Sequence, residues 1–273
     1  MIKQAIIPLA GLGTRLLPLT SVLPKELLPI NGKPGLEYIL DECIEAGIKE
    51  FIFIISNKKM SIKKYFYNDK VLLKVLKKKK KNNELLLKYK KIKKLRKMIK
   101  FVYQNSPRGT GDAILKCKKL IKSNYFLMLL PDDLIIKKNC SLSMIKLHNK
   151  YKSSVIASKK VNKKDVTRWG IFKLKRFKKN NFVIKDVVEK PSIKLAPSTY
   201  AVIGRYILPK KIFNILKHQK PGQNGEIHIT DAIRALIYLK NKFIGHIFSG
   251  KYLDCGTMNG YIKSTLEISK LKL

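Results

Sequence analysis

The sequence has little of several residue types, and each scarcity argues against a class of protein. Only four of the 273 residues are cysteine, and none of them forms a CxxC pair. Neither a zinc ribbon nor a disulfide framework fits such spacing, so reduced thiols in the cytoplasm are expected. The four histidines also lack metal-binding spacing. No apolar run approaches the roughly 20 residues of a membrane helix, and we expect no secretory signal, because the apolar stretch at 2–9 leads directly into a turn.

Acidic residues are also scarce, since 18 of them face 59 lysines and arginines and leave a net charge of +41. Such a charge is typical of nucleic-acid-binding proteins. Only seven of these cations are arginine, the side chain suited to bidentate phosphate and guanine contacts. We therefore interpret the charge mainly as the compositional drift of a chain rich in lysine, isoleucine and asparagine, whose codons are A/T-rich. Nucleic-acid binding remains the alternative, and the charge should attract anionic substrates in either case.

The apolar pattern of the first half predicts a doubly wound, mostly parallel, Rossmann-like α/β sheet. Continuous apolar runs, which fit strands buried on both faces, alternate with helix-like stretches. The runs lie at 5–9, 51–55 and 125–130, and the helical stretches at 36–46 and 111–121.

The second half predicts an antiparallel extension of the sheet that covers one side of a ligand site. Short β-type runs follow one another closely, and helical patterns return afterwards. The runs lie at 153–159, 170–174, 182–188 and 199–208, and the helical patterns at 210–218, at 230–239 and after Gly256. We expect a single domain, 1–273, with halves 1–150 and 151–273.

Lysine is concentrated at 71–100, where five lysines in a row occupy 77–81. The pattern predicts a long amphipathic helix or a helical hairpin. We favour a solvated helix face over a nucleic-acid or localisation signal.

A glycine-rich loop follows the first predicted strand. Gly11, Gly13 and Thr14 precede Arg15, and Lys25 follows ten residues later. Ligands of open α/β sheets bind beyond the carboxyl ends of the strands, and glycine lets backbone N–H groups approach a phosphate. A dinucleotide fingerprint is excluded because Leu16 stands where its third glycine belongs. A Walker loop does not fit either, since a proline follows the Gly-Lys pair at 32–33.

The segments Gly11–Pro18 and Pro24–Pro29 resemble the signature loop of the sugar nucleotidylyltransferases. Pro-Lys-Glu at 24–26 is most similar to the bacterial members that use UTP and glucose 1-phosphate. Sister enzymes that use dTTP or another sugar phosphate are the nearest alternative. The resemblance implies that the loop wraps the triphosphate, that Arg15 and Lys25 contact its phosphates, and that 1–150 is the nucleotide-binding half.

Further matches imply the remaining site residues. Gln104 and Gly109 resemble the base-reading segment, with Ala10 and Gly11 completing the pocket, although Asp112 stands where relatives commonly have histidine. A glutamine amide can match either a donor or an acceptor on the base.

Glu189 and Lys190 match the sugar side of the family in the half 151–273. Gly170 and Gly204 would let sugar hydroxyls reach the backbone. The resemblance ends soon after Tyr261, which leaves a homo-oligomer an open alternative.

Two aspartates are the candidate ligands of Mg²⁺. Asp132 ends the third central strand and faces the loop, whereas Asp133 could cap the following segment. The family's second aspartate corresponds to Asp254. The implied reaction is attack by a sugar phosphate on the α-phosphorus of UTP. That nucleophile is already anionic, so no Ser/His or Cys/His pair is required, and Arg15, Lys25 and Lys190 would offset the repulsion between two polyanions.

Overall fold

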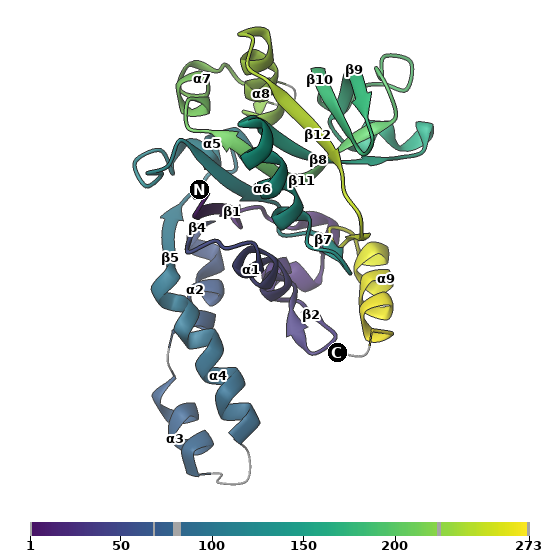
Figure 1. Cartoon of the computed structure of the whole chain (residues 1–273). Coiled ribbons are helices and arrows are strands. Elements are labelled where there is room, and N and C mark those ends of the chain that lie inside the picture. The colour runs from purple at the N-terminus through teal and green to yellow at the C-terminus, as the bar shows by residue number, and fades with distance from the viewer. Residues whose placement is uncertain (1, 68, 79–82, 223–224, 272–273) are drawn as a thin grey trace.

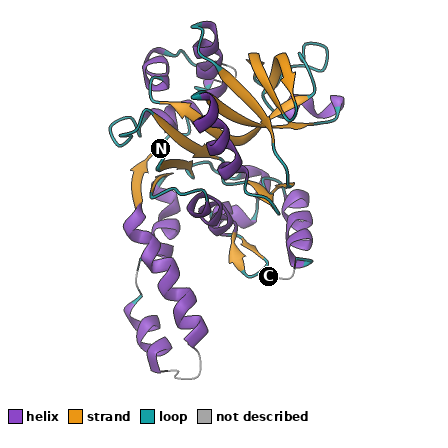
Figure 2. Cartoon of the chain, in the orientation of Figure 1, coloured by secondary structure: helices purple, strands orange, loops and turns teal. Residues whose placement is uncertain are grey.

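The computed structural model describes residues 2–67, 69–78, 83–222 and 225–271. A long mixed sheet runs through the body of the molecule, with helices along both of its faces (Figures 1 and 2). In spatial order its strands are β5 (Ile99–Tyr103), β4 (Glu50–Ile55), β1 (Gln4–Pro8), β6 (Tyr125–Leu129), β11 (Tyr200–Pro209), β8 (Ser154–Lys160), β12 (Phe243–Ile247), β10 (Asn181–Val188) and β9 (Ile171–Lys178).

The first four of these strands, β5, β4, β1 and β6, are parallel. Successive residues of β1 pack into hydrophobic cores on opposite faces of the sheet, because side chains alternate across a strand. Ala5 and Ile7 pack with α1 (Gly35–Glu45), α2 (Met60–Phe66) and α6 (Cys140–Tyr151). Ile6 packs on the other face, against the helices α5 (Thr110–Leu115), α7 (Ile212–His218) and α8 (Ile229–Tyr238). Burial on both faces explains the continuous apolar runs.

The second half departs from the predicted extension, because its strands close on themselves. β11 runs antiparallel to both β6 and β8, β12 pairs parallel to β8, and β10 and β9 follow as antiparallel neighbours. The pairing of Ala201 in β11 with Ile171 in β9 completes a ring of strands. The sheet is therefore mixed rather than mostly parallel, and its extension is a closed barrel that leaves no free edge at β9.

A buried ion pair joins the two halves at the centre of the sheet. Arg205 of β11 donates to both carboxylate oxygens of Glu42 in α1, the shortest bond being 2.8 Å from Nη2 to Oε2. The same guanidinium donates to the Leu130 carbonyl oxygen at 3.3 Å. Arg205 is fully buried, and this pairing fixes the segment after β6, to which Asp132 belongs.

A second, small ladder brings the end of the chain back to β6. β7 (Asp133–Ile136) pairs antiparallel with β13 (Lys251–Asp254), and the register places Asp254 opposite Asp133. The helix α9 (Met258–Ser269) follows, and a short ribbon of β2 (Pro29–Ile30) and β3 (Lys33–Pro34) lies beside it. Aspartates far apart in the sequence are neighbours as a result.

The lysine-rich segment forms a helical hairpin, which was one of the two predicted forms. Its arms are α3 (Lys70–Lys78) and α4 (Asn83–Leu95), and they project away from the body (Figure 1). Three of the five consecutive lysines, at 79–81, lie outside the described residues. Across the described ranges, no helix has the length and apolar character needed to cross a membrane.

Candidate active site

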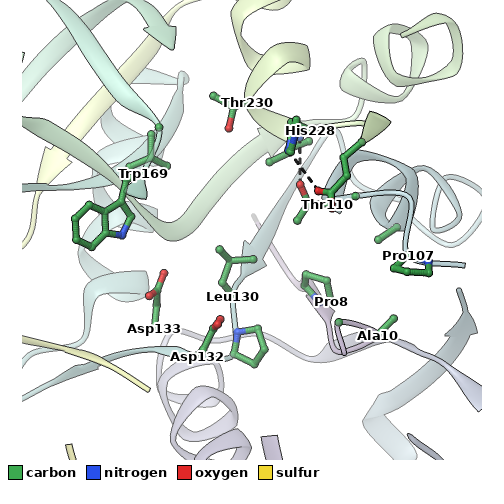
Figure 3. Close-up of a pocket in the computed structure, with 18 of the residues that line it drawn as sticks. Pro8, Ala10, Pro107, Thr110, Leu130, Asp132, Asp133, Trp169, His228 and Thr230 are labelled. Atoms are coloured by element: carbon green, nitrogen blue, oxygen red, sulfur yellow. Dashed lines mark hydrogen bonds and ion pairs between the residues drawn. The ribbon is translucent and has the colours of Figure 1, made fainter. Parts of the chain in front are cut away.

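A cavity of about 560 Å³ opens at the carboxyl ends of β1 and β6. Figure 3 shows Ala10 and Pro107 on one side of it and Trp169 on the opposite side, with Asp132 between them. All but one of the residues predicted for the site line this cavity. They are Ala10, Gly11, Gly13, Thr14, Arg15, Lys25, Gln104, Gly109, Asp132, Gly170, Glu189, Lys190 and Asp254.

The glycine-rich loop begins directly after β1 and is fixed from within. Gly13 adopts a left-handed conformation, with φ of 74°, and a Cβ there would lie 3.1 Å from the Thr20 side chain. The Thr20 hydroxyl donates to the Gly13 carbonyl oxygen at 2.8 Å, and the buried Leu16 anchors the next turn. Gly11 differs, because a Cβ there would meet nothing within 4 Å. The loop is therefore rigid at Gly13, while the open space at Gly11 faces the cavity.

Lys25 and Arg15 converge on Asp132. Lys25 Nζ lies 2.7 Å from Asp132 Oδ2, and Arg15 Nη2 lies 3.7 Å from the same oxygen. Burial disfavours the charged form of Lys25, but attraction from Asp132 and Glu26 outweighs it and raises the lysine pKa. Burial likewise disfavours ionised Asp132, but Lys25 outweighs it and lowers that pKa. Both groups therefore stay charged near neutral pH.

A buried ion pair that the sequence did not reveal holds Lys25 in place. Both carboxylate oxygens of Glu26 accept from Lys59 Nζ, at 2.9 and 2.8 Å, and both side chains are buried. Burial lowers the pKa of Lys59 despite its partner. Glu26 belongs to the short turn Lys25–Leu27, so its anchor at Lys59 fixes the direction of Lys25. Pro-Lys-Glu was visible in the sequence, but the partner 33 residues away was not.

Asp132 and Asp254 meet around Gly256. A Cβ on Gly256 would lie 2.9 Å from Asp132 Oδ2 and 3.1 Å from Asp254 Oδ1. The Cys255 N–H donates to the Asp132 carbonyl oxygen at 2.8 Å, and Arg168 Nη2 donates to Asp254 Oδ2 at 2.9 Å. Converging carboxylate oxygens suit Mg²⁺, which takes one or two protein carboxylates and completes its shell with water and phosphate. The described residues offer no cluster of three or more Asp, Glu, His or Cys, so substrate oxygens would have to supply the other ligands.

Gly204 is the predicted site residue that does not line the cavity, and its predicted contact with sugar hydroxyls is not supported. Its N–H already donates to Asp133 Oδ2 at 2.9 Å. A Cβ there would lie 2.5 Å from that oxygen and 2.6 Å from Leu130 Cβ. Glycine is required because Asp133 and Leu130 pack against the backbone of β11.

Asp133 is a half-buried carboxyl at the cavity wall rather than a cap of the following segment. Its Oδ1 accepts from the Tyr252 hydroxyl at 2.6 Å. Burial and the neighbouring Asp132 charge raise the pKa of Asp133 to about 6. Its partners in β11 and β13 tie both strands to the segment after β6.

The predicted sugar side lies across the cavity from the loop. A Cβ on Gly170 would lie 3.1 Å from Val202 and 3.2 Å from Glu189 Oε2, so glycine gives the carboxylate its room. Lys190 has a φ of 41°, which is strained for a residue with a side chain. Its N–H donates to the Trp169 carbonyl oxygen at 3.1 Å. The backbone thus holds Glu189 and Lys190 as neighbours at the cavity wall.

Several lining residues were not assigned from the sequence. Tyr206 lies in the β-type run at 199–208 and Thr230 begins the helical pattern at 230–239, but neither was assigned a role in the site. Trp169 and His228 were not assigned one either. Other lining residues of this kind are Pro107, Thr110, Met128 and Glu226. The lysine-rich hairpin contributes none of the lining residues found in the described part of the chain.

Comparison with known proteins identifies the family of this chain. A family model described as nucleotidyl transferase matches residues 4–270. The chain belongs to the nucleotidyl transferase family. The match runs beyond Tyr261, the point near which the sequence resemblance was expected to end.

Relatives within the family are similar over nearly the whole chain. The UTP–glucose-1-phosphate uridylyltransferase of Bacillus subtilis is 37% identical over 269 residues, covering 98% of this chain and 91% of that protein. The enzyme of the same name from Mycoplasma pneumoniae is 36% identical over 270 residues, covering 97% and 91%.

Solved structures agree with this chain in fold. A UDP-glucose pyrophosphorylase complexed with UDP-glucose superposes with a TM-score of 0.88 at 37% identity, with 99% of both chains covered. The UTP-bound enzyme of Acinetobacter baumannii gives 0.87 at 33% identity, covering 98% of this chain and 93% of the other. The mixed sheet described above is therefore the fold of this nucleotidyl transferase.

Proposed function

We propose that this protein transfers a uridylyl group from UTP to glucose 1-phosphate and forms UDP-glucose and pyrophosphate. The observation that carries the proposal is the convergence on one cavity of the loop at Gly11–Arg15, Lys25, both aspartates and the pair Glu189 and Lys190. Relatives that share more than a third of the sequence bear the name of this activity.

The two walls of the cavity suit two different phosphate compounds. The loop and Arg15 lie on the side of β1, where backbone N–H groups and a guanidinium can contact a triphosphate. Glu189 can accept hydrogen bonds from sugar hydroxyls, and Lys190 can neutralise the phosphate of the sugar. Lys25 and Asp132 lie between these walls, where the α-phosphate would meet its nucleophile.

The proposed reaction requires little proton transfer by the protein. A phosphate oxygen of glucose 1-phosphate forms a bond to the α-phosphorus of UTP. The bond between the α-phosphorus and the oxygen that bridges it to the β-phosphorus breaks, and pyrophosphate leaves with that electron pair. Because the attacking oxygen is already anionic, the barrier lies in repulsion and alignment. Lys25 is held at Asp132 by a buried anchor, so its charge is already oriented toward the transferring group.

The donor set fits a Mg²⁺ ion. Asp132 and Asp254, whose carboxylate oxygens both lie close to Gly256, would hold it, and Lys25 and Arg168 now balance the charge of these carboxylates. When bound, Mg²⁺ supplies charge neutralisation on the phosphate oxygens and the leaving group. We also propose that the protein is cytoplasmic, because all four of its cysteines are free and buried.

A product assay tests the proposal. The purified protein receives Mg²⁺, glucose 1-phosphate and, one at a time, UTP, dTTP, ATP, GTP or CTP, and pyrophosphate release is measured. We expect release with UTP and identification of UDP-glucose by mass spectrometry. A clear preference for dTTP, or for galactose 1-phosphate in the matching sugar series, would identify a sister enzyme. No release with any pair would overturn the proposal.

A further inference from the structure

Gln104 follows β5, and its side chain lines the cavity while being almost wholly buried. Its backbone N–H donates to the Ile55 carbonyl oxygen at 2.9 Å, which ties the residue to the neighbouring strand β4. A glutamine amide carries a donor end and an acceptor end. Gln104 alone could therefore read either kind of group on a base, and its orientation decides which.

Asp112 decides this orientation. Gln104 Nε2 donates to Asp112 Oδ2 at 2.7 Å and to the Gly109 carbonyl oxygen at 3.3 Å. An ionised carboxylate and a carbonyl only accept hydrogen bonds, so only the NH₂ end of the amide can face them. No hydrogen bond found among the described residues uses Gln104 Oε1. The oxygen is thus the polar end of the amide left for a ligand.

The environment of Asp112 keeps the carboxylate where it is. Asp112 lies in the first turn of α5, and Lys116 Nζ lies 4.0 Å from its Oδ2. The loop before it is clamped, because the Gly111 N–H donates to the Ile227 carbonyl oxygen at 2.7 Å. A Cβ on Gly111 would lie 2.7 Å from the Ile227 side chain, so the two segments are in close contact. The orienting group is therefore part of a rigid unit.

We propose that Asp112 is a positioning residue that makes the nucleotide site select bases with an N–H at ring position 3. By holding the Gln104 amide with Oε1 toward the cavity, it presents an acceptor to uracil or thymine. Cytosine has a lone pair at that ring position and would meet the oxygen with no hydrogen between them, which leaves buried polar atoms unpaired. This inference deepens the proposed function and takes from it the placement of the base near Gln104.

Replacement of Asp112 by asparagine tests the proposal. Asp112→Asn keeps the shape, but its amide can present either a donor or an acceptor, so only the longer bond to the Gly109 carbonyl oxygen still favours one orientation of Gln104. We expect the ratio of the CTP to the UTP dissociation constant to fall by about 10-fold or more, the size of a charge-assisted hydrogen bond. Asp112→Glu, which still only accepts, should retain more of the ratio than Asp112→Asn.

Binding can be measured without turnover. Trp169 is the only tryptophan of the chain and lines the cavity, so its fluorescence reports nucleotide binding in the presence of Mg²⁺. Asp231→Asn is the matched control, because Asp231 is an acidic residue in the first turn of α8 and does not line the cavity. That variant should keep the wild-type ratio.

The outcomes separate this inference from the proposed function. An unchanged ratio in Asp112→Asn, equal weakening of both nucleotides, or a wild-type protein that binds UTP and CTP alike would each overturn the role of Asp112. If the wild type discriminates through Asp112 but releases no pyrophosphate, the proposed function fails and the inference stands. If turnover with UTP is normal but the ratio of dissociation constants is the same in Asp112→Asn as in the wild type, the proposed function stands and the inference fails.

Discussion

Replacement of Lys25 by alanine is expected to lower kcat by about 100- to 1,000-fold. The Lys25 side chain is only 16% exposed, so solvent screens its charge weakly. Removal of one preoriented charge donor at a transferring group costs about 3–4 kcal/mol in the transition state, which corresponds to this loss in rate. The effect should appear in kcat, because the charge matters most where negative charge is developing.

The neighbouring cation gives an internal comparison. Arg15 approaches the same Asp132 oxygen but lies 3.7 Å away, and its side chain is 61% exposed. Solvent and salt screen such a charge more strongly, so Arg15→Ala should cost only about 10-fold, or about 1.4 kcal/mol. For the same reason Arg15 cannot replace Lys25 in the Lys25→Ala variant.

The assay is steady-state pyrophosphate release with saturating UTP and glucose 1-phosphate. Lys33→Ala is the control for removal of a lysine, because Lys33 pairs with Asp41 at 2.7 Å at the surface and away from the cavity. It should change kcat by less than about 2-fold. Circular dichroism confirms that the Lys25 variant is folded. A folded Lys25→Ala enzyme with near-wild-type kcat would refute the assignment of Lys25 to the reacting phosphate.

Three further outcomes are expected. Asp132→Ala should abolish the Mg²⁺ dependence of turnover, and an unchanged magnesium titration would refute its assignment as a ligand. Glu26→Gln leaves buried Lys59 without a full counter-charge and should lower the free energy of unfolding by about 3 kcal/mol in urea titrations. The control Glu84→Gln removes an exposed ion pair and should leave the urea midpoint unchanged. Equal effects of the two variants would contradict a stabilising role of the buried pair. Burial lowers the pKa of His148 below 6.5, so the unfolded chain takes up this proton more readily and stability should fall as pH decreases below 6.5. His148→Gln should reduce that slope, and a variant with the wild-type slope would exclude His148 as a source.

The local features of the fold could be predicted from the sequence. The apolar run at 5–9 is buried on both faces in β1, and the helical pattern at 36–46 became α1 at Gly35–Glu45. Such predictions succeed because the spacing of apolar residues and the helix propensity depend on residues close together in the chain. Strand β5 (Ile99–Tyr103) was not predicted, and its first two residues fall within the lysine-rich segment 71–100.

The candidate site was predicted largely from motifs that are compact in the sequence. Gly11–Arg15 forms the predicted loop because Gly13 must adopt a positive φ in a tight turn, a requirement that only adjacent residues impose. Gly204 shows what such motifs leave out, because this glycine makes room for Asp133, 71 residues away. A sequence shows that a glycine is present but not which neighbour requires it.

The sequence by itself determined the kinds of chemical group available: a phosphate-binding loop, cations, carboxylates and an ambiguous glutamine. Only the tertiary structure decided how they are paired. Lys25 meets Asp132 across 107 residues, Glu26 meets Lys59, and Asp112 turns the amide of Gln104. The barrel closes through one pairing between β9 and β11. These contacts depend on how distant segments pack, and the free energy of such packing has no counterpart in the pattern of neighbouring residues.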